Sequence, residues 1–414
     1  MIYTPFKKKP VGDHGFFLDH MKKEDHKKAF AEYAKDWCFS FAPGRIEFLG
    51  NHLDYNGGEV LGMAVNAGIY CLGVPQPHNQ ISFFSESFED SGWSGEIDKI
   101  ERQSGKFSWN NYTLGVLKEL HSQNLTPKKA FRLIFTSDLP TSVGLSSSAA
   151  LELASALTIL QLAGKSLPKK ELANLCRLAE NEFVGLPCGI LDQGTSAFGK
   201  KDHLVHIDCD DEVFGNIRIP AESEVWIFNT GIKHDLVDSL YSTRHQECMD
   251  ALKEGRKRFP DKDKLTSFSL DEINELNLPE NLRKRATHVS QEQLRVQSFR
   301  TGLVSDASPE ELGKLLAESH ASSSQNFENS CRELDFLAEH LNQHDAVLGA
   351  RLTGGGFGGA VMAWTQSNFS KKDAKEIVSL YHQEFGQEID YHNFLPSDGA
   401  RKEDILKVEP DSNQ

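Results

Sequence analysis

A small-residue loop that runs directly into a long, almost entirely apolar helix is the strongest constraint on the fold. The loop at residues 137–145 contains Ser, Thr, Pro and Gly, and residues 146–163 are rich in Ala and Leu. A helix with apolar side chains on nearly all sides is buried rather than amphipathic. Gly164 and Pro168 are typical residues after a helix end. A short strand predicted at 131–135 precedes the loop, so the chain mixes strands with a buried helix.

The start of this helix is a candidate anion site. Ser146, Ser147 and Ser148 follow Gly144 and Leu145 at the first turn. A helix N-terminus presents unpaired N–H groups and the positive end of the helix dipole, which together attract phosphate. Serine is also a preferred N-cap residue, so capping alone explains the serines as well. At this point both interpretations stay open.

Two other nucleotide-binding patterns fit poorly. Gly164-Lys-Ser166 lacks the first glycine of the Walker pattern, because Ile159 stands there. The cluster Gly354-Gly-Gly-Phe-Gly-Gly359 matches G-x-G-x-x-G, but a strand pattern follows it where a dinucleotide fold has a helix. The cluster is therefore either a tight turn with positive φ or a close approach of backbone to a ligand.

A polar loop lies between two predicted strands. Residues 37–49 and 60–74 are apolar runs, and they flank Gly50-Asn-His-Leu-Asp-Tyr-Asn-Gly-Gly58. Polar side chains mounted between buried strands favour a binding role.

Two acidic residues further along are ambiguous on their own. Asp192 lies in the segment 185–194, which Gly and Pro interrupt, and is either a loop-capping or a catalytic carboxylate. Glu180 falls on a helix predicted at 169–183, where a surface glutamate is the commoner explanation.

The composition indicates which binding partners are disfavoured and which cellular compartment is expected. The 414 residues include 60 acidic and 45 basic ones, and this formal charge of −15 disfavours binding to nucleic acid or to an anionic membrane surface. No apolar stretch predicts a signal peptide or a membrane span. The seven cysteines are odd in number and never form C-x-x-C, which argues against a disulfide framework and a zinc site. The expected location is the cytoplasm.

Length and pattern predict more than one structural unit. We expect an N-terminal arm at residues 1–36, a first domain at 37–215 and a second domain at 216–414. Residues 254–295 are strongly charged, which predicts a solvated excursion on the surface of the second domain.

Three motifs together resemble galactokinases of the GHMP kinase family. They are Ala42-Pro-Gly-Arg45-Ile-Glu-Phe-Leu-Gly50-Asn-His-Leu-Asp54-Tyr-Asn-Gly-Gly58, Gly144-Leu-Ser-Ser-Ser-Ala-Ala-Leu-Glu152 and Leu352-Thr-Gly-Gly-Gly-Phe-Gly-Gly359. They resemble, in turn, the galactokinase signature, the phosphate loop and the third motif of the family. Three motifs in the family's order are far more specific than any one of them.

The resemblance implies an α+β, two-lobed GHMP kinase fold with the active site in the interlobe cleft. It implies a monomeric enzyme that uses ATP and Mg²⁺ to phosphorylate the anomeric hydroxyl of galactose, giving α-galactose 1-phosphate. Galacturonate, arabinose or N-acetylgalactosamine are alternative acceptors, and a catalytically silent sugar sensor is the alternative to an enzyme.

The resemblance also implies a role for each matching position. Asp192 matches the catalytic aspartate and Arg45 the arginine beside it, while Ser148 and Glu180 match the magnesium ligands. The ATP positions are Trp109, Tyr112, Ser142, Gly144, Leu145, Ser146 and Ser147. The sugar contacts are Asn51, His52, Asp54, Gly189 and Tyr241.

Two positions depart from the family pattern. Ser142 replaces a glycine of the phosphate loop, and Asn51 replaces the glutamate that accepts a hydrogen bond from the sugar's 6-hydroxyl. Asparagine carries both a donor and an acceptor, so it fits a neutral galactose or, with a nearby cation such as Lys233, a uronate. The departure leaves the exact sugar open.

Overall fold

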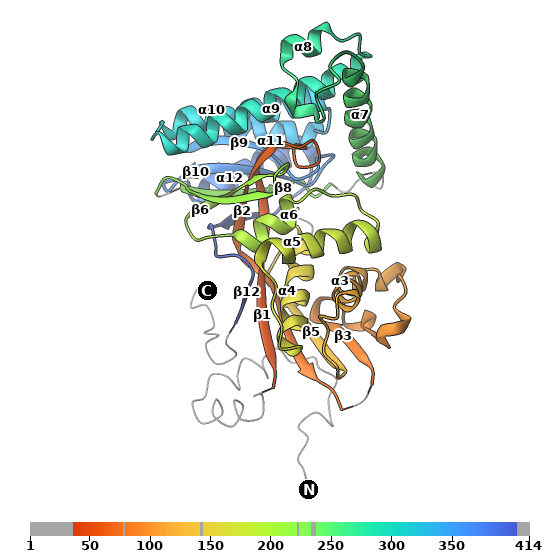
Figure 1. The fold of residues 1–414 in the computed structure, drawn as a ribbon. Helices are drawn as coiled ribbons and strands as arrows, with labels where there is room; N and C mark the ends of the chain where they lie inside the picture. The colour runs from red at the N-terminus through yellow and green to blue at the C-terminus, as the bar shows by residue number, and fades with distance from the viewer. Residues whose placement is uncertain (1–35, 78, 141–143, 222, 233–236, 404–414) are drawn as a thin grey trace.

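The computed structural model describes residues 36–77, 79–140, 144–221, 223–232 and 237–403. Within these ranges the strands form two sheets, one in each of two lobes (Figure 1). The eight-stranded sheet follows the path β12 (Arg401–Lys402), β1 (Cys38–Leu49), β2 (Glu59–Pro75), β5 (Phe131–Ser137), β3 (Ile81–Ser85) and β4 (Trp93–Gly95). Strands β6 (His203–Asp208) and β7 (Val213–Arg218) extend it from β2. The four-stranded sheet has the order β11 (Tyr391–Phe394), β8 (Ser223–Asn229), β10 (Ala360–Gln366) and β9 (Val347–Thr353).

The hairpin of β1 and β2 carries the polar loop predicted between them. The two strands pair antiparallel, and their register shifts between Pro43 and Arg45 and again between Glu47 and Leu49. Such irregularities bend a strand and re-aim its side chains. Both predicted strands are therefore confirmed, and the bends lie beside the arginine and the loop that the motifs single out.

The apolar helix α4 (Ser147–Leu162) packs against β1 and β2, which confirms the predicted buried helix. Its Ala154 carbonyl accepts a hydrogen bond from Ser40 on β1 (2.8 Å). The helix is flanked by α3 (Asn110–Ser122) and α5 (Lys169–Leu178), and α6 (Leu191–Phe198) also contacts β1 and β2. The chain between α5 and α6 includes a π-helical segment, Ala179–Val184.

The second lobe carries the remaining described α-helices (Figure 1). They are α7 (Val237–Arg258), α8 (Leu270–Glu275), α9 (Glu280–Val304), α10 (Pro309–Ser322), α11 (Arg332–Asn342) and α12 (Lys371–Phe385). Helix α10 lies directly against β9, because Gly313 and Gly349 face each other. A Cβ at Gly313 would lie 1.8 Å from the Leu348 carbonyl oxygen, so only glycine allows this approach. No described helix is both long and apolar enough to cross a bilayer.

The prediction of a solvated excursion at 254–295 is wrong for its second part. Helix α9 buries Ala286 and Val289 in the core, and its polar residues Arg285, His288, Glu292 and Arg295 are buried as well. These charges are paired rather than solvated: the Arg285 guanidinium lies 2.6 Å from Glu247, and that of Arg295 lies 2.7 Å from Glu292. The number of charged residues in a segment does not show which of them pair with one another when the chain folds, so composition alone predicted exposure. The domain boundary predicted after residue 215 falls inside β7.

Candidate active site

Arg45 and Asp192 form the centre of the site. The Arg45 guanidinium binds both carboxylate oxygens of Asp192, with Nε to Oδ1 at 2.6 Å and Nη2 to Oδ2 at 2.8 Å. Its Nη1 donates to the Gly144 carbonyl oxygen (2.7 Å). Arg45 is buried on β1, whereas the Asp192 side chain, in the first turn of α6, keeps 24% of its surface exposed. A bidentate arginine thus fixes a carboxylate that still meets solvent.

The phosphate-loop serines do not serve as helix caps. Ser146 is the N-cap residue of α4, but its side chain caps none of the described N–H groups, and its hydroxyl donates to Asp192 instead. Its backbone is left-handed (φ 48°), an uncommon conformation for a residue with a side chain. Ser147 is exposed at the first helical position. The first turn of α4 is therefore open to an anion, as the phosphate interpretation requires.

The other predicted nucleotide positions lie in the loop before α4 and at the start of α3. Leu145 is buried, and its carbonyl oxygen accepts from the Arg45 amide (2.9 Å). Trp109 and Tyr112 lie at the start of α3, which packs along α4. The exposed ring of Phe88 stacks on Trp109, with centroids 5.9 Å apart. Ser142 lies outside the described residues, as does Lys233.

Three carboxyl groups gather beside the serines. Glu180 is 6% exposed, so the expectation of a surface glutamate is wrong. Its burial, with Asp192 nearby, raises its pKa to about 7, and a hydrogen bond with Ser148 opposes that shift. The Gln193 amide nitrogen donates to Glu180 (2.6 Å) and to the fully buried Glu152 (3.0 Å). Burial and Glu180 also raise the pKa of Glu152 well above its usual value.

This acidic group suits a magnesium ion bound together with phosphates. Mg²⁺ takes oxygen ligands, and sites that bind substrate phosphates use one or two carboxylates and several waters. Ser148 and Glu180 offer such oxygens at the open end of α4. The described residues contain no group of three or more His, Cys, Asp or Glu that could hold a metal ion, so a metal here needs oxygens from the phosphates. The donor set thus fits a metal shared with a nucleotide.

Three of the predicted sugar contacts surround Asp192. The Asp54 carboxylate lies against Gly189, where a Cβ would lie 2.2 Å from Asp54 Oδ2. Burial, Asp192 and Glu47 raise the pKa of Asp54 to about 7. The ring of Tyr241, on α7, packs against His52 with centroids 5.3 Å apart, and burial, Asp54 and Asp192 raise the pKa of Tyr241 well above its usual value. Asp54, Gly189 and Tyr241 therefore lie together near the pair of Arg45 and Asp192.

The other two predicted sugar contacts are engaged by the protein. Asn51 is fully buried and bonded on all sides to protein groups. His52 Nδ1 lies 2.8 Å from the Tyr55 hydroxyl, and its Nε2 lies 3.1 Å from the Asn329 amide nitrogen. Burial lowers the pKa of His52 well below its usual value, so the ring is neutral.

The glycine loop 354–359 closes the site from the second lobe. Gly354, Gly356, Gly358 and Gly359 all have positive φ, which confirms the tight turn. A Cβ at Gly356 would lie 2.1 Å from the Asn329 carbonyl oxygen, so this glycine also permits a close backbone approach.

Sequence reasoning assigned no role to several residues that hold this site. Glu152 lies one helical turn after Ser148, so helical spacing identifies it, whereas Gln193 directly follows Asp192 and adjacency alone gives no such signal. Asn329, Glu292 and Arg351 carry no such signal, because only the folded chain brings Asn329 and Glu292 to the loop at 50–58 and Arg351 to Glu47 at the end of β1.

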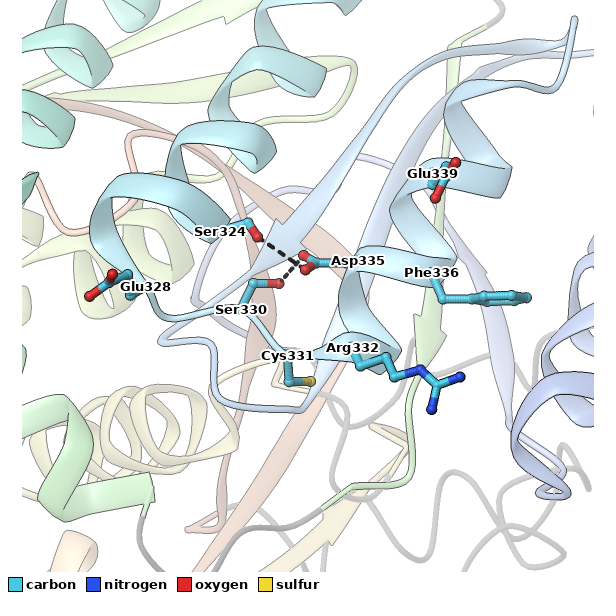
Figure 2. A pocket seen from close by; sticks show the side chains of 8 residues that line it. All are labelled: Ser324, Glu328, Ser330, Cys331, Arg332, Asp335, Phe336 and Glu339. Atoms are coloured by element: carbon cyan, nitrogen blue, oxygen red, sulfur yellow. Dashed lines mark hydrogen bonds between the residues drawn. The ribbon is translucent and has the colours of Figure 1, made fainter.

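A separate pocket of about 560 Å³ opens on the second lobe (Figure 2). It is lined by Ser324, Glu328, Ser330, Cys331, Arg332, Asp335, Phe336 and Glu339. Its central Asp335 accepts hydrogen bonds from Ser324 (3.0 Å) and Ser330 (2.6 Å). The pocket includes none of the residues predicted for sugar, ATP or metal.

Comparison with known proteins agrees with this geometry. Family models match at residues 24–75 (galactokinase galactose-binding signature), 111–200 (GHMP kinases N-terminal domain) and 302–384 (GHMP kinases C-terminal). The chain is 38% identical over 365 residues to a galactokinase of Thermotoga petrophila, covering 87% of this chain and 99% of the relative. It is 32% identical over 370 residues to a galactokinase of Bacillus subtilis, covering 88% and 94%.

Solved structures show the same relationship. A Lactococcus lactis galactokinase complexed with galactose superposes with a TM-score of 0.84 at 30% identity, covering 91% of this chain and 98% of that one. A Methanococcus jannaschii mevalonate kinase superposes with a TM-score of 0.62 at 17% identity, covering 87% and 98%, and shares the fold.

Proposed function

The chain belongs to the galactokinase family of GHMP kinases, and from this premise we propose that it transfers the γ-phosphoryl group of ATP to the anomeric hydroxyl of galactose. The product is α-galactose 1-phosphate. The single observation that carries the proposal is the Asp192 carboxylate, held by Arg45 beside the open N-terminus of α4. This arrangement supports the proposal, because phosphoryl transfer to a hydroxyl requires a proton acceptor next to an anion site.

The residues divide the chemistry between them. Asp192 orients the anomeric hydroxyl and accepts its proton, and the bidentate hydrogen bond from Arg45 holds that carboxylate in place. The amides at the start of α4 and the hydroxyls of Ser146 and Ser147 bind phosphate oxygens. Positioning and charge stabilisation supply most of the rate enhancement in reactions of this type. Trp109 and Tyr112 line the nucleotide pocket.

Magnesium is part of the proposal. Ser148 and Glu180 would hold it, and when bound it neutralises charge on the transferring phosphates. The raised pKa of Glu180 supports this assignment, because a carboxylate kept close to other acidic groups gains most from an added cation.

Replacing Glu180 by glutamine should raise the magnesium concentration for half-maximal rate roughly tenfold or more, because an amide is a poorer ligand for a hard dication. In the parent enzyme the same concentration should rise as the pH falls below about 7, where a proton competes for Glu180. That pH dependence should disappear in Glu180→Gln. Magnesium titrations between pH 6 and 8 measure both effects. Glu182→Gln, at an exposed neighbour, is the matched control. An unchanged magnesium requirement would return Glu180 to a purely structural role.

We propose that the protein is a monomer and that it is located in the cytoplasm. All seven cysteines are free thiols, which supports a reducing compartment.

The direct test is galactose-dependent formation of ADP, with the product identified by mass and by its α-anomeric phosphorus coupling. We expect turnover with galactose, ATP and magnesium together, and none when any one is left out. Binding of galactose without ADP formation would instead favour a sugar sensor. The intact pair of Arg45 and Asp192 argues against that alternative.

A further inference from the structure

The Asn51 side chain has no hydrogen-bonding capacity left for a sugar. Its Nδ2 donates to Glu47 Oε1 (2.9 Å) and to the Gly354 carbonyl oxygen (2.9 Å). Its Oδ1 accepts from Asn329 Nδ2 (2.9 Å) and from the Ser323 hydroxyl (3.3 Å). A primary amide offers two donors and two lone pairs, so all four are used, and the residue is 0% exposed.

The Asn51 backbone is held from the second lobe as well. Glu292 Oε1 accepts from the Asn51 amide (3.1 Å), and His288 Nε2 lies 3.2 Å from its carbonyl oxygen. Burial raises the pKa of Glu292, but Arg295 and His288 outweigh burial and lower it to about 2, so the acceptor stays ionised. Helix α9 therefore fixes the start of the loop at 50–58.

Glu47 explains why an amide stands at position 51. The Glu47 carboxylate is 5% exposed and accepts from Asn51 Nδ2 and from Arg351 Nη2 (3.0 Å). A carboxylate at position 51 would direct an oxygen at both Glu47 and the Gly354 carbonyl, and buried like charges repel strongly. The chain has its acidic group at 47 and the matching donor at 51.

We propose that Asn51 is a positioning residue rather than a sugar contact. Together with Glu47 and Asn329 it joins the loop at 50–58 to the glycine loop 354–359, and so sets where Asp54 stands relative to Asp192. Asn329 strengthens the link, since its Nδ2 also lies 3.2 Å from the Gly355 carbonyl oxygen. The sugar is then read by Asp54, Tyr241 and the backbone at Gly189. This inference rests on the proposed function for its kinetic test, but not for its stability test.

The first test compares galactose with 6-deoxygalactose in the parent enzyme and in Asn51→Asp. This variant keeps the size of the side chain and removes both donors. We expect KM to rise at least tenfold, with a smaller change in kcat, and by the same factor for both sugars. A direct contact to the 6-hydroxyl predicts instead a much smaller factor for 6-deoxygalactose, and that result would overturn the proposal.

The second test is rescue by Glu47→Gln. A glutamine at 47 supplies an N–H that an aspartate at 51 accepts, so the double variant should recover part of the lost melting temperature and part of the KM. Asn56→Asp is the matched control, because the buried Asn56 amide donates to the His52 carbonyl oxygen within the loop (2.7 Å) and not to Glu47. The loss of melting temperature in Asn56→Asp should simply add to the loss in Glu47→Gln, with no recovery in the double variant.

The melting temperatures require no substrate, so they separate this inference from the proposed function. If no sugar is turned over, the proposed function fails, while recovery in the double variant still supports the link between the loops. Strictly additive losses in Asn51→Asp and Glu47→Gln would overturn the link, whether or not galactose is the substrate.

Discussion

Replacing Asp192 by asparagine should lower kcat by roughly 10²–10⁴-fold, the usual contribution of a positioned proton acceptor. An amide has the shape of the carboxylate but does not accept the proton of the anomeric hydroxyl. Its carbonyl oxygen still accepts a hydrogen bond from Arg45, so the side chain should stay in place. ATP affinity should change little, because the phosphates bind at α4. Steady-state kinetics and nucleotide titration measure the two effects.

The Asp192→Asn variant should also fold. Arg45 loses its ionic partner, which is unfavourable for a buried guanidinium. At the same time Glu180 and Asp54 lose a like charge that raises both of their pKa values. These effects oppose each other, so we expect only a modest change in melting temperature.

Asp98→Asn is the matched control for this variant, since Asp98 is an exposed residue in the first lobe. Asp98→Asn also removes one negative charge, but at a residue that does not contact Arg45. A near-normal kcat for Asp192→Asn would show that Asp192 only orders Arg45, and the proposed proton transfer would be wrong.

Local sequence pattern predicted the parts of this site that local structure builds. The strands β1 and β2, the buried helix α4 and the turn at 354–359 each have a signature within one segment. Hydrophobic periodicity and glycine placement report such features directly.

The parts that pattern missed depend on distant residues. Asn51 and Asn329 are 278 positions apart, and Asn51 and Glu292 are 241 apart. A buried polar residue and an exposed one look alike in a sequence until their partners are known. This is why the charged helix α9 was expected in solvent. The resemblance placed Asn51 at a sugar contact, and it carries no information on the partners that this chain gives Asn51.

Galacturonate should be phosphorylated with a kcat/KM at least about 100-fold below that of galactose. We base this prediction on the acidic groups around the proposed sugar site, which would repel the carboxylate of galacturonate. Asp54 has a pKa of about 7 because burial and two other carboxylates disfavour its charge. Two buried arginines of this region, Arg45 and Arg351, are each already paired with a carboxylate, Asp192 and Glu47. Placing a further anion beside these groups costs several kcal/mol, and a factor of 100 corresponds to about 2.7 kcal/mol.

The ratio of kcat/KM for galactose over galacturonate should depend on pH in a defined direction. As the pH falls through about 7, Asp54 takes up a proton and its repulsion of the uronate disappears. The sugar carboxyl stays ionised, since such groups titrate near pH 3 to 4. The ratio should therefore be larger at pH 8 than at pH 6. Asp54→Asn should weaken the binding of both sugars, but it should also make the ratio nearly independent of pH. Asp98→Asn should leave the pH dependence of the ratio unchanged. Galacturonate preferred tenfold at pH 8 would contradict the proposed acceptor and would require a cation in the part of the chain that the structure does not describe.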